Sequence, residues 1–129
     1  MKVGVPSEIK PNEHRVGLTP TAVREYVTHG HEVLVQAGAG AGAGYSDEAY
    51  TRAGAKIAPD AAAVFAGGDL IVKVKEPQPE EWARLTDRHL LFTYLHLAPD
   101  PAQADGLIAS GCAAIAYETV TDAAGGLPL

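Results

Sequence analysis

The sequence predicts an α/β fold, in which one open parallel sheet carries helices on both faces. Short apolar runs alternate with helical stretches along the chain. The first unit is an expected strand at 2–5, a helix that begins at Pro20 and a strand at 32–36; this order implies parallel pairing with a right-handed crossover. Later runs such as DLIVKVK are rich in β-branched residues. The repeated alternation predicts a three-layer sheet of about five to six strands.

Residues that favour helix ends divide the chain further. Thr19, Ser46, Asp60 and Asp100 are expected N-caps, and several glycines are placed to end the helices that follow. Proline at the first helical position strengthens the first and last of these starts. The expected helices are 20–29, 46–53, 61–67, 80–85 and 101–110, and the remaining expected strands are 56–58, 69–75, 90–95 and 112–117.

Composition excludes several classes of protein. A chain of 129 residues that is 47% hydrophobic fits one domain with a packed core. The formal net charge of −6 argues against a nucleic-acid partner, because phosphate binding needs a basic surface. No apolar stretch is long enough to span a bilayer, and the N-terminus is too polar for a signal peptide. We therefore expect a cytoplasmic protein without membrane contact.

The thiol and the imidazoles give no sign of a metal site. Cys112 is the only cysteine, which excludes an intrachain disulfide and a zinc site of paired cysteines. Its apolar surroundings, CAAIAY, predict a small core residue. No two of the five histidines have metal-ligand spacing on one face, so we expect no metal. His89, which precedes a strand, is expected to be exposed.

Polar residues that follow the strands are the candidate site, because ligands of open parallel sheets bind beyond the carboxyl ends of the strands. Arg15 lies in the loop after the first strand, and Lys75, His96 and Glu118 end or follow three later ones. Tyr94 shares strand parity with His96, so both can face one cleft if the strand continues that far. Arginine offers a fork for a carboxylate, lysine a point charge for a keto oxygen, and histidine a proton near neutral pH. The set suits a small 2-oxo or 2-amino acid.

Each candidate also has a purely structural interpretation. Arg15 could be a surface ion-pair partner, and Lys73 and Lys75 could be the solvated ends of an edge strand. His96 could satisfy a backbone carbonyl at the end of a strand. Glu118 could cap a helix or lie on the surface. Position alone leaves these alternatives open.

The run AGAGAGAGY formally fits the dinucleotide fingerprint G-x-G-x-x-A through Gly38, Gly40 and Ala43. That fingerprint needs a helix that opens inside the glycines, so that its N-terminus meets the pyrophosphate. Here the glycines continue to Gly44, the next helix is expected only from Ser46, and no strand ending in an acidic residue follows at the right distance. We therefore expect a surface or subunit-contact loop and no cofactor-binding residue.

The N-terminal part resembles the signature shared by alanine dehydrogenases and the α subunit of proton-translocating nicotinamide nucleotide transhydrogenase, through the string GVPSEIKPNEHRVGLTPTAVREYVTHGHEV. The later strings DLIVKVKEP, LLFTYLHLA and IAYETV are similar to the alanine dehydrogenase branch in particular. The resemblance covers essentially the whole chain. It implies a flavodoxin- or Rossmann-like fold and the NAD-linked conversion of L-alanine to pyruvate and ammonia, by proteins that are commonly hexamers.

The resemblance also implies roles for individual residues. Arg15 matches an arginine that binds the substrate carboxylate, and Lys75 a lysine that holds its carboxylate or keto oxygen. His96 matches the catalytic acid/base, and Tyr94 and Glu118 match residues that line or support the pocket.

Residues 1–129 would then be the substrate-binding domain, with the NAD-binding Rossmann domain absent. We expect this chain to bind L-alanine or pyruvate but not NAD, to be inactive alone, to need the missing domain as a partner, and to form a homo-oligomer. Two alternatives are the matching domain of transhydrogenase α and a non-enzymatic module for small-acid binding or assembly.

Overall fold

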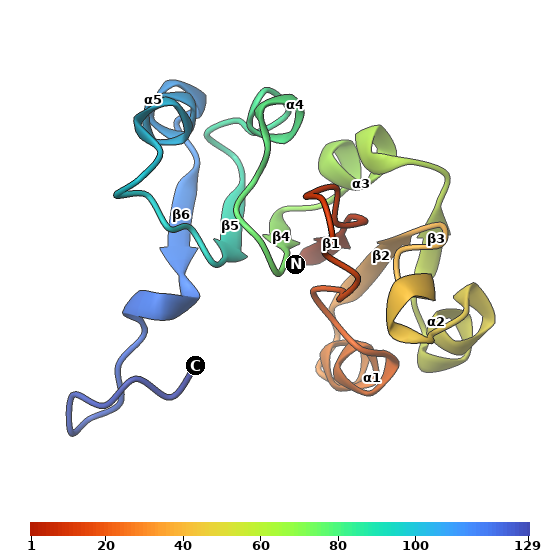
Figure 1. The fold of residues 1–129 in the computed structure, drawn as a ribbon. Helices are drawn as coiled ribbons and strands as arrows, with labels where there is room; N and C mark the ends of the chain where they lie inside the picture. Colours follow the sequence, from red (N-terminus) through yellow and green to blue (C-terminus); the bar gives the residue numbers. More distant parts are fainter.

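The computed structural model describes residues 1–129 and contains one sheet of six parallel strands in the order β3-β2-β1-β4-β5-β6 (Figure 1). The strands are β1 (Lys2–Val5), β2 (Glu32–Gln36), β3 (Lys56–Ala58), β4 (Leu70–Val72), β5 (Leu90–Thr93) and β6 (Ala113–Ala116). The helices are α1 (Pro20–Thr28), α2 (Asp47–Ala53), α3 (Ala61–Gly67), α4 (Pro79–Trp82) and α5 (Pro101–Ser110), with 3₁₀ turns η1 (Ala41–Ala43) and η2 (Tyr117–Thr119).

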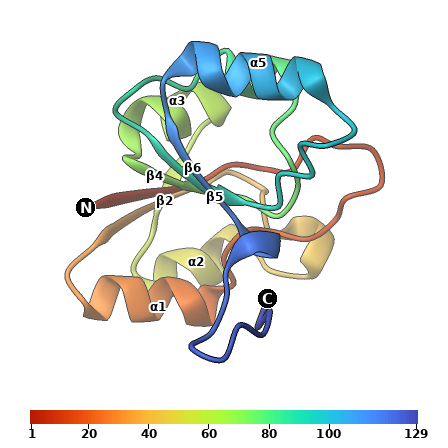
Figure 2. The same cartoon turned by 90° about the vertical axis from the view of Figure 1, so that its left-hand side faces the viewer.

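Helices cover both faces of the sheet, which confirms the predicted three-layer α/β class. In Figure 2, α1 and α2 lie below the sheet, and α3 and α5 lie above it. Each face has its own core: one cluster joins Val23 of α1 and Tyr50 of α2 to the sheet, and the other joins Phe65 of α3 and Leu107 of α5. Half-buried Cys112 packs against the second cluster, as its apolar neighbours predict.

The order of the strands locates the functional edge. The chain starts at β1, winds outward through β2 and β3, and then returns to β4 on the other side of β1. The loops that leave β1 and β4 therefore diverge, and open sheets of this kind bind ligands in the crevice at that switch point. Lys10, Arg15 and Lys75 all lie in the loops that follow β1 and β4.

The predicted helix starts are confirmed by hydrogen bonds. Thr19, Ser46, Asp60 and Asp100 each accept a bond at the N-terminus of α1, α2, α3 and α5. The fourth expected helix is shorter than predicted, ending at Trp82. None of the helices is both long and apolar enough to cross a membrane.

The strand expected at 69–75 pairs as β4 only over Leu70–Val72. The reason is that the amides of Val74 and Lys75 donate to the side chain of Glu8. Pairing with β1 ends there and a carboxylate takes the place of a strand neighbour, while the amide of Lys73 and the carbonyl oxygen of Val74 still bond to Phe92 and Tyr94.

The strand expected at 90–95 ends in the same manner, at Thr93. The amides of Leu95 and His96 donate to the carboxylate of Glu118. The expected strand at 112–117 pairs over Ala113–Ala116 and then turns into η2.

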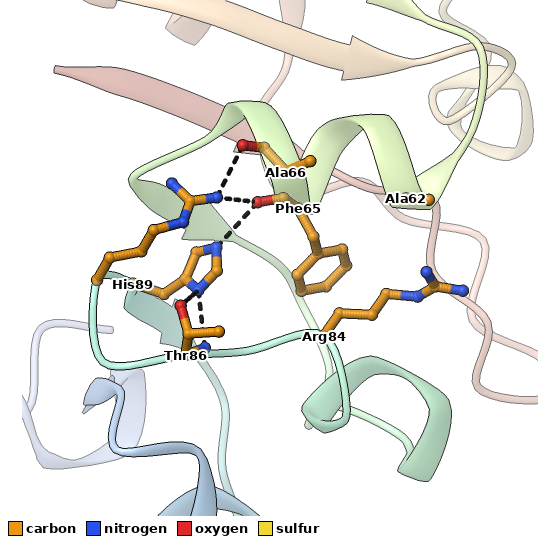
Figure 3. Close-up of a pocket in the computed structure, with 7 residues that line it drawn as sticks. Ala62, Phe65, Ala66, Arg84, Thr86 and His89 are labelled. Carbon is orange, nitrogen blue, oxygen red and sulfur yellow. Dashed lines mark hydrogen bonds between the residues drawn. The ribbon is translucent and has the colours of Figure 1, made fainter.

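The structure contradicts one open alternative and one expectation about exposure. Lys73 does not lie on an edge strand, because β4 is paired on both sides, and its side chain is only 1% exposed. His89 is also buried, with 3% of the residue exposed. Its Nε2 lies 2.9 Å from the carbonyl oxygen of Phe65, and its Nδ1 lies 2.9 Å from the amide of Thr86 (Figure 3).

These contacts give His89 a structural role. The Thr86 amide needs an acceptor, so Nδ1 is unprotonated and Nε2–H donates to Phe65. Arg88 also donates to the carbonyl oxygens of Phe65, Ala66 and Gly68. Together the two side chains satisfy carbonyls that the C-terminus of α3 leaves open, and they attach α3 to the start of β5.

We expect His89→Ala to lower the free energy of unfolding by about 1 to 3 kcal/mol, since it removes the buried bond to the carbonyl oxygen of Phe65 and leaves the part-buried Thr86 amide without an acceptor. Urea unfolding would measure the change. His29→Ala is the matched control: its bond to the carbonyl oxygen of Glu25 is exposed, so the loss should stay within about 0.5 kcal/mol. Equal losses in the two variants would contradict the structural role of His89.

Candidate functional site

A buried ion cluster lies where the chain leaves β1 and β4. Lys73 Nζ is 3.1 Å from Glu8 Oε2 and 2.9 Å from Glu81 Oε1, and all three side chains are at most 4% exposed. Burial raises the pKa of Glu81 above its ordinary value, although the ammonium of Lys73 opposes that shift. The cluster ties the loop after β1 to the end of β4 and to α4.

Arg15 lies in the same loop as Glu8 and pairs with Glu13. Its Nε and Nη2 are 2.8 and 2.6 Å from the two carboxylate oxygens, so one edge of the guanidinium is taken. Nη1 makes no hydrogen bond within the chain, and the side chain is 62% exposed. Glu13 thus fixes the orientation of Arg15 and leaves its Nη1 end for an external carboxylate.

Lys75 differs from the other cations of this edge because it has no ion pair. Lys10 pairs with Glu76, Arg15 with Glu13, and Lys73 with Glu8 and Glu81. The half-buried Lys75 makes none, and its charge contributes to lowering the pKa of Glu13. A half-buried ammonium without a partner can hold an anionic or carbonyl oxygen.

Tyr94 and His96 lie together, as predicted, but strand parity is not the cause. β5 ends before them, and His96 adopts a left-handed backbone conformation with φ of 47°. Their rings stack with centroids 5.6 Å apart and an interplanar angle of 9°. His96 is exposed, so its imidazole is accessible for proton exchange.

Glu118 fixes the backbone of this segment. Its Oε1 is 2.7 Å from the amide nitrogen of His96 and 3.1 Å from that of Leu95. Burial by itself would raise the pKa of Glu118, but these amides outweigh it and the pKa is lowered. Glu118 is therefore a carboxylate that supports His96 through its main chain. It is neither a helix cap nor an unpaired surface group.

Tyr117 joins the two halves of the site. Its hydroxyl donates to the carbonyl oxygen of Lys73 at 2.8 Å, and its ring meets that of Tyr94 edge-on, with centroids 5.0 Å apart. Burial raises the pKa of Tyr117 to about 12, so it stays a neutral donor.

Sequence reasoning missed the roles of Tyr117, Glu8, Glu13 and Glu81 in this edge. Glu8 and Glu13 lie in the candidate loop, and their acidic side chains among cations were the available signal. Glu81 lies in α4, far along the sequence from the loop, and no sequence pattern pairs it with Lys73.

The glycines of the glycine-rich loop pack closely against other parts of the chain. A side chain at Gly40 would lie 2.5 Å from the ring of Tyr50, and one at Gly42 would lie 2.7 Å from the carbonyl oxygen of His14. These glycines are therefore needed for packing within the chain. The helix that follows, α2, begins with Asp47 and Glu48, which repel phosphate.

Two cavities border the regions described above. One, of about 140 Å³, lies between the loop after β1 and the glycine-rich loop, and it is lined by Ser7, Glu8, Glu13, His14, Arg15, Gly38, Ala39 and Gly42. The largest, of about 410 Å³, lies at the opposite, amino-terminal edge of the sheet beside His89, where the polar groups cap α3 (Figure 3). No group of three histidine, cysteine or acidic side chains is arranged to hold a metal ion.

The pair of Glu13 with Arg15 makes a prediction about pH. Hydrogen bonding to Arg15 lowers the pKa of Glu13 from 4.5 to about 2. The pair therefore contributes stability above the ordinary carboxyl value and loses it as pH falls toward 2. We expect NMR titration to place the Glu13 carboxyl near this lowered pKa, and Arg15→Ala to return it toward 4.5. A Glu13 carboxyl that titrates alike in both proteins would refute the pair.

The chain has clear relatives along its full length. Residues 4–129 match the family model described as "Alanine dehydrogenase/PNT, N-terminal domain". The alanine dehydrogenase of Halomonas elongata is 54% identical over all of this chain and 35% of its own length. That of Mycobacterium tuberculosis H37Rv is 50% identical over the same shares of the two chains.

Solved structures agree with these relatives. An L-alanine dehydrogenase superposes with a TM-score of 0.95 and 46% identity, over 99% of this chain and 35% of that one. A transhydrogenase from Sinorhizobium meliloti superposes with a TM-score of 0.85 and 27% identity, over 92% of this chain and 35% of that one. This chain thus spans about a third of the length of the proteins it matches. It belongs to the alanine dehydrogenase/PNT N-terminal domain family.

Proposed function

We propose that this chain is the substrate-binding part of an NAD-dependent L-alanine dehydrogenase, which converts L-alanine, NAD and water to pyruvate, ammonia and NADH. One observation carries the proposal: the unpaired ammonium of Lys75 lies at the switch point of the sheet, on the same edge as Arg15 and His96. Membership in the family supports the choice of reaction.

In this proposal the two cations bind the acid. Arg15 offers Nη1 and the free hydrogen of Nη2 to the substrate carboxylate, while Glu13 keeps the guanidinium oriented. Lys75 binds the carboxylate or the keto oxygen, and its charge favours the electron-rich carbonyl of pyruvate. Tyr94 stacks on His96 and forms a side of the pocket.

His96 moves the proton. Oxidative deamination requires a base when water adds to the imine carbon and an acid when the amine leaves, and an exposed imidazole can serve as both. Glu118 holds the His96 backbone amide and so keeps the ring over the site. In this proposal NAD binding and the oxidation itself belong to a separate nucleotide-binding domain, since these residues match about a third of the length of their relatives.

An NAD-binding domain and further copies of the chain are the proposed protein partners, in a cytoplasmic homo-oligomer. An apolar groove of about 240 Å³ beside the edge strand β6 supports the proposal that another protein surface packs on this face. Its lining is entirely apolar: Leu95, Leu97, Ala104, Leu107, Ile108, Cys112 and Ala114.

Isothermal titration with pyruvate tests the binding role. We expect the chain to bind pyruvate and both Arg15→Ala and Lys75→Ala to weaken binding at least about tenfold, since each removes a charge-assisted hydrogen bond. Arg24→Ala and Lys56→Ala remove exposed cations elsewhere on the chain and should bind like the wild type. Wild-type protein without measurable pyruvate binding would favour the transhydrogenase-type domain, in which the alanine site is not kept.

Activity in trans separates a dehydrogenase part from a non-enzymatic module. We expect a polypeptide of these 129 residues to produce no NADH from L-alanine and NAD, because hydride transfer needs a bound nicotinamide and the proposal assigns NAD binding to another domain. Addition of the nucleotide-binding part of a relative should restore NADH formation in wild-type protein but not in His96→Ala. Turnover by the 129 residues alone would contradict the proposal, as would complemented turnover that is unaffected by His96→Ala.

A further inference from the structure

The buried carboxylate of Glu8 has no part in the binding scheme, yet it contacts the segment that carries Lys75. We propose that Glu8 is a positioning residue that holds the backbone amides of Val74 and Lys75 and thereby fixes the point from which the Lys75 ammonium reaches the ligand. The inference rests on the proposed role of Lys75 in substrate binding.

Glu8 receives three donors and meets no acceptor. Its Oε1 lies 2.7 Å from the amide nitrogen of Val74. Its Oε2 lies 3.2 Å from the amide nitrogen of Lys75 and 3.1 Å from Lys73 Nζ. The side chain is 1% exposed, so water does not compete for these bonds. Three convergent donors specify a carboxylate, because the amide of glutamine would turn an NH₂ group toward one of them.

The contact accounts for how the chain leaves β4. Past Val72, β1 no longer offers carbonyl oxygens to the amides of this segment. A buried amide without an acceptor costs about 1 to 3 kcal/mol. Glu8 satisfies two successive amides, and Lys73 balances its charge. Lys73 thus places a positive charge beside Glu8, beneath the peptide of Lys75.

Lys75 is held on the other side of its backbone as well. The hydroxyl of Thr93 donates to the carbonyl oxygen of Lys75 at 2.9 Å, and the amide of Tyr94 donates to the carbonyl oxygen of Val74 at 3.2 Å. The amide and carbonyl groups of Lys75 are therefore both fixed. Its flexible side chain starts from one defined point, and removal of Glu8 would release one of the two restraints.

Glu81 provides a matched control within the same cluster. Its Oε1 pairs with Lys73 Nζ at 2.9 Å, and its Oε2 accepts the amide of Gln78 at 2.8 Å. It makes no hydrogen bond to the amide of Val74 or Lys75. Glu81→Gln therefore disturbs the same buried charges without releasing the Lys75 peptide, and a merely structural role would make the two glutamines equivalent.

The test compares Glu8→Gln with Glu81→Gln by isothermal titration with pyruvate. We expect both variants to unfold at lower urea concentration, but only Glu8→Gln to weaken pyruvate binding, by about tenfold. Glu8→Gln that binds like the wild type, or equal weakening by the two variants, overturns the inference. Wild-type protein without pyruvate binding is instead a failure of the proposed function.

A measurement without ligand decides the role of Glu8 independently. Hydrogen exchange at the amides of Val74 and Lys75 should accelerate at least about tenfold in Glu8→Gln and stay unchanged in Glu81→Gln. If Glu8→Gln does not fold, Glu8→Asp replaces it in both experiments. The aspartate keeps the charge beside Lys73 but is one methylene too short to reach both amides. Unchanged exchange of the two amides in the folded variant overturns the inference.

Discussion

The site depends on two carboxylates that receive backbone amides where β4 and β5 stop. Glu8 receives the amides of Val74 and Lys75, and Glu118 those of Leu95 and His96. Each carboxylate accepts hydrogen bonds from backbone amides that no longer pair with a neighbouring strand. Each segment can therefore leave the sheet without an amide that lacks an acceptor. The segments released in this way carry Lys75 and His96. The same bonds that end the strands therefore place the two groups most suited to chemistry.

The overall fold was predictable because its signals are local. The N-caps Thr19, Ser46 and Asp60 and the alternation of apolar runs depend only on neighbours in sequence, and the structure reproduces them. The positions of Arg15 and Lys75 beyond strand ends followed from the general geometry of parallel sheets. Neither of these steps required knowledge of which side chains meet.

The errors share one physical cause, which is pairing between residues distant in sequence. The alternative of a solvated strand end fails for Lys73, whose partners, Glu8 and Glu81, come from other elements. His89 was expected to be exposed because its carbonyl acceptor belongs to α3. A polar residue is buried only when its hydrogen bonds are satisfied, and whether they are depends on the assembled fold. Propensity and alternation therefore give the positions of such residues but not their burial.

Charge pairing also explains why Lys75, among neighbouring cations, is suited to a ligand. This edge carries Lys10, Arg15, Lys73 and Lys75, and the first three each have carboxylates of the chain beside them. A buried or half-buried cation without a partner costs folding free energy. Lys75 is the one cation of the four that bears this cost. An anionic ligand that binds there recovers an interaction that the protein does not supply to itself. The unpaired charge of Lys75 is therefore the feature of this edge on which the proposed preference for a small acid depends.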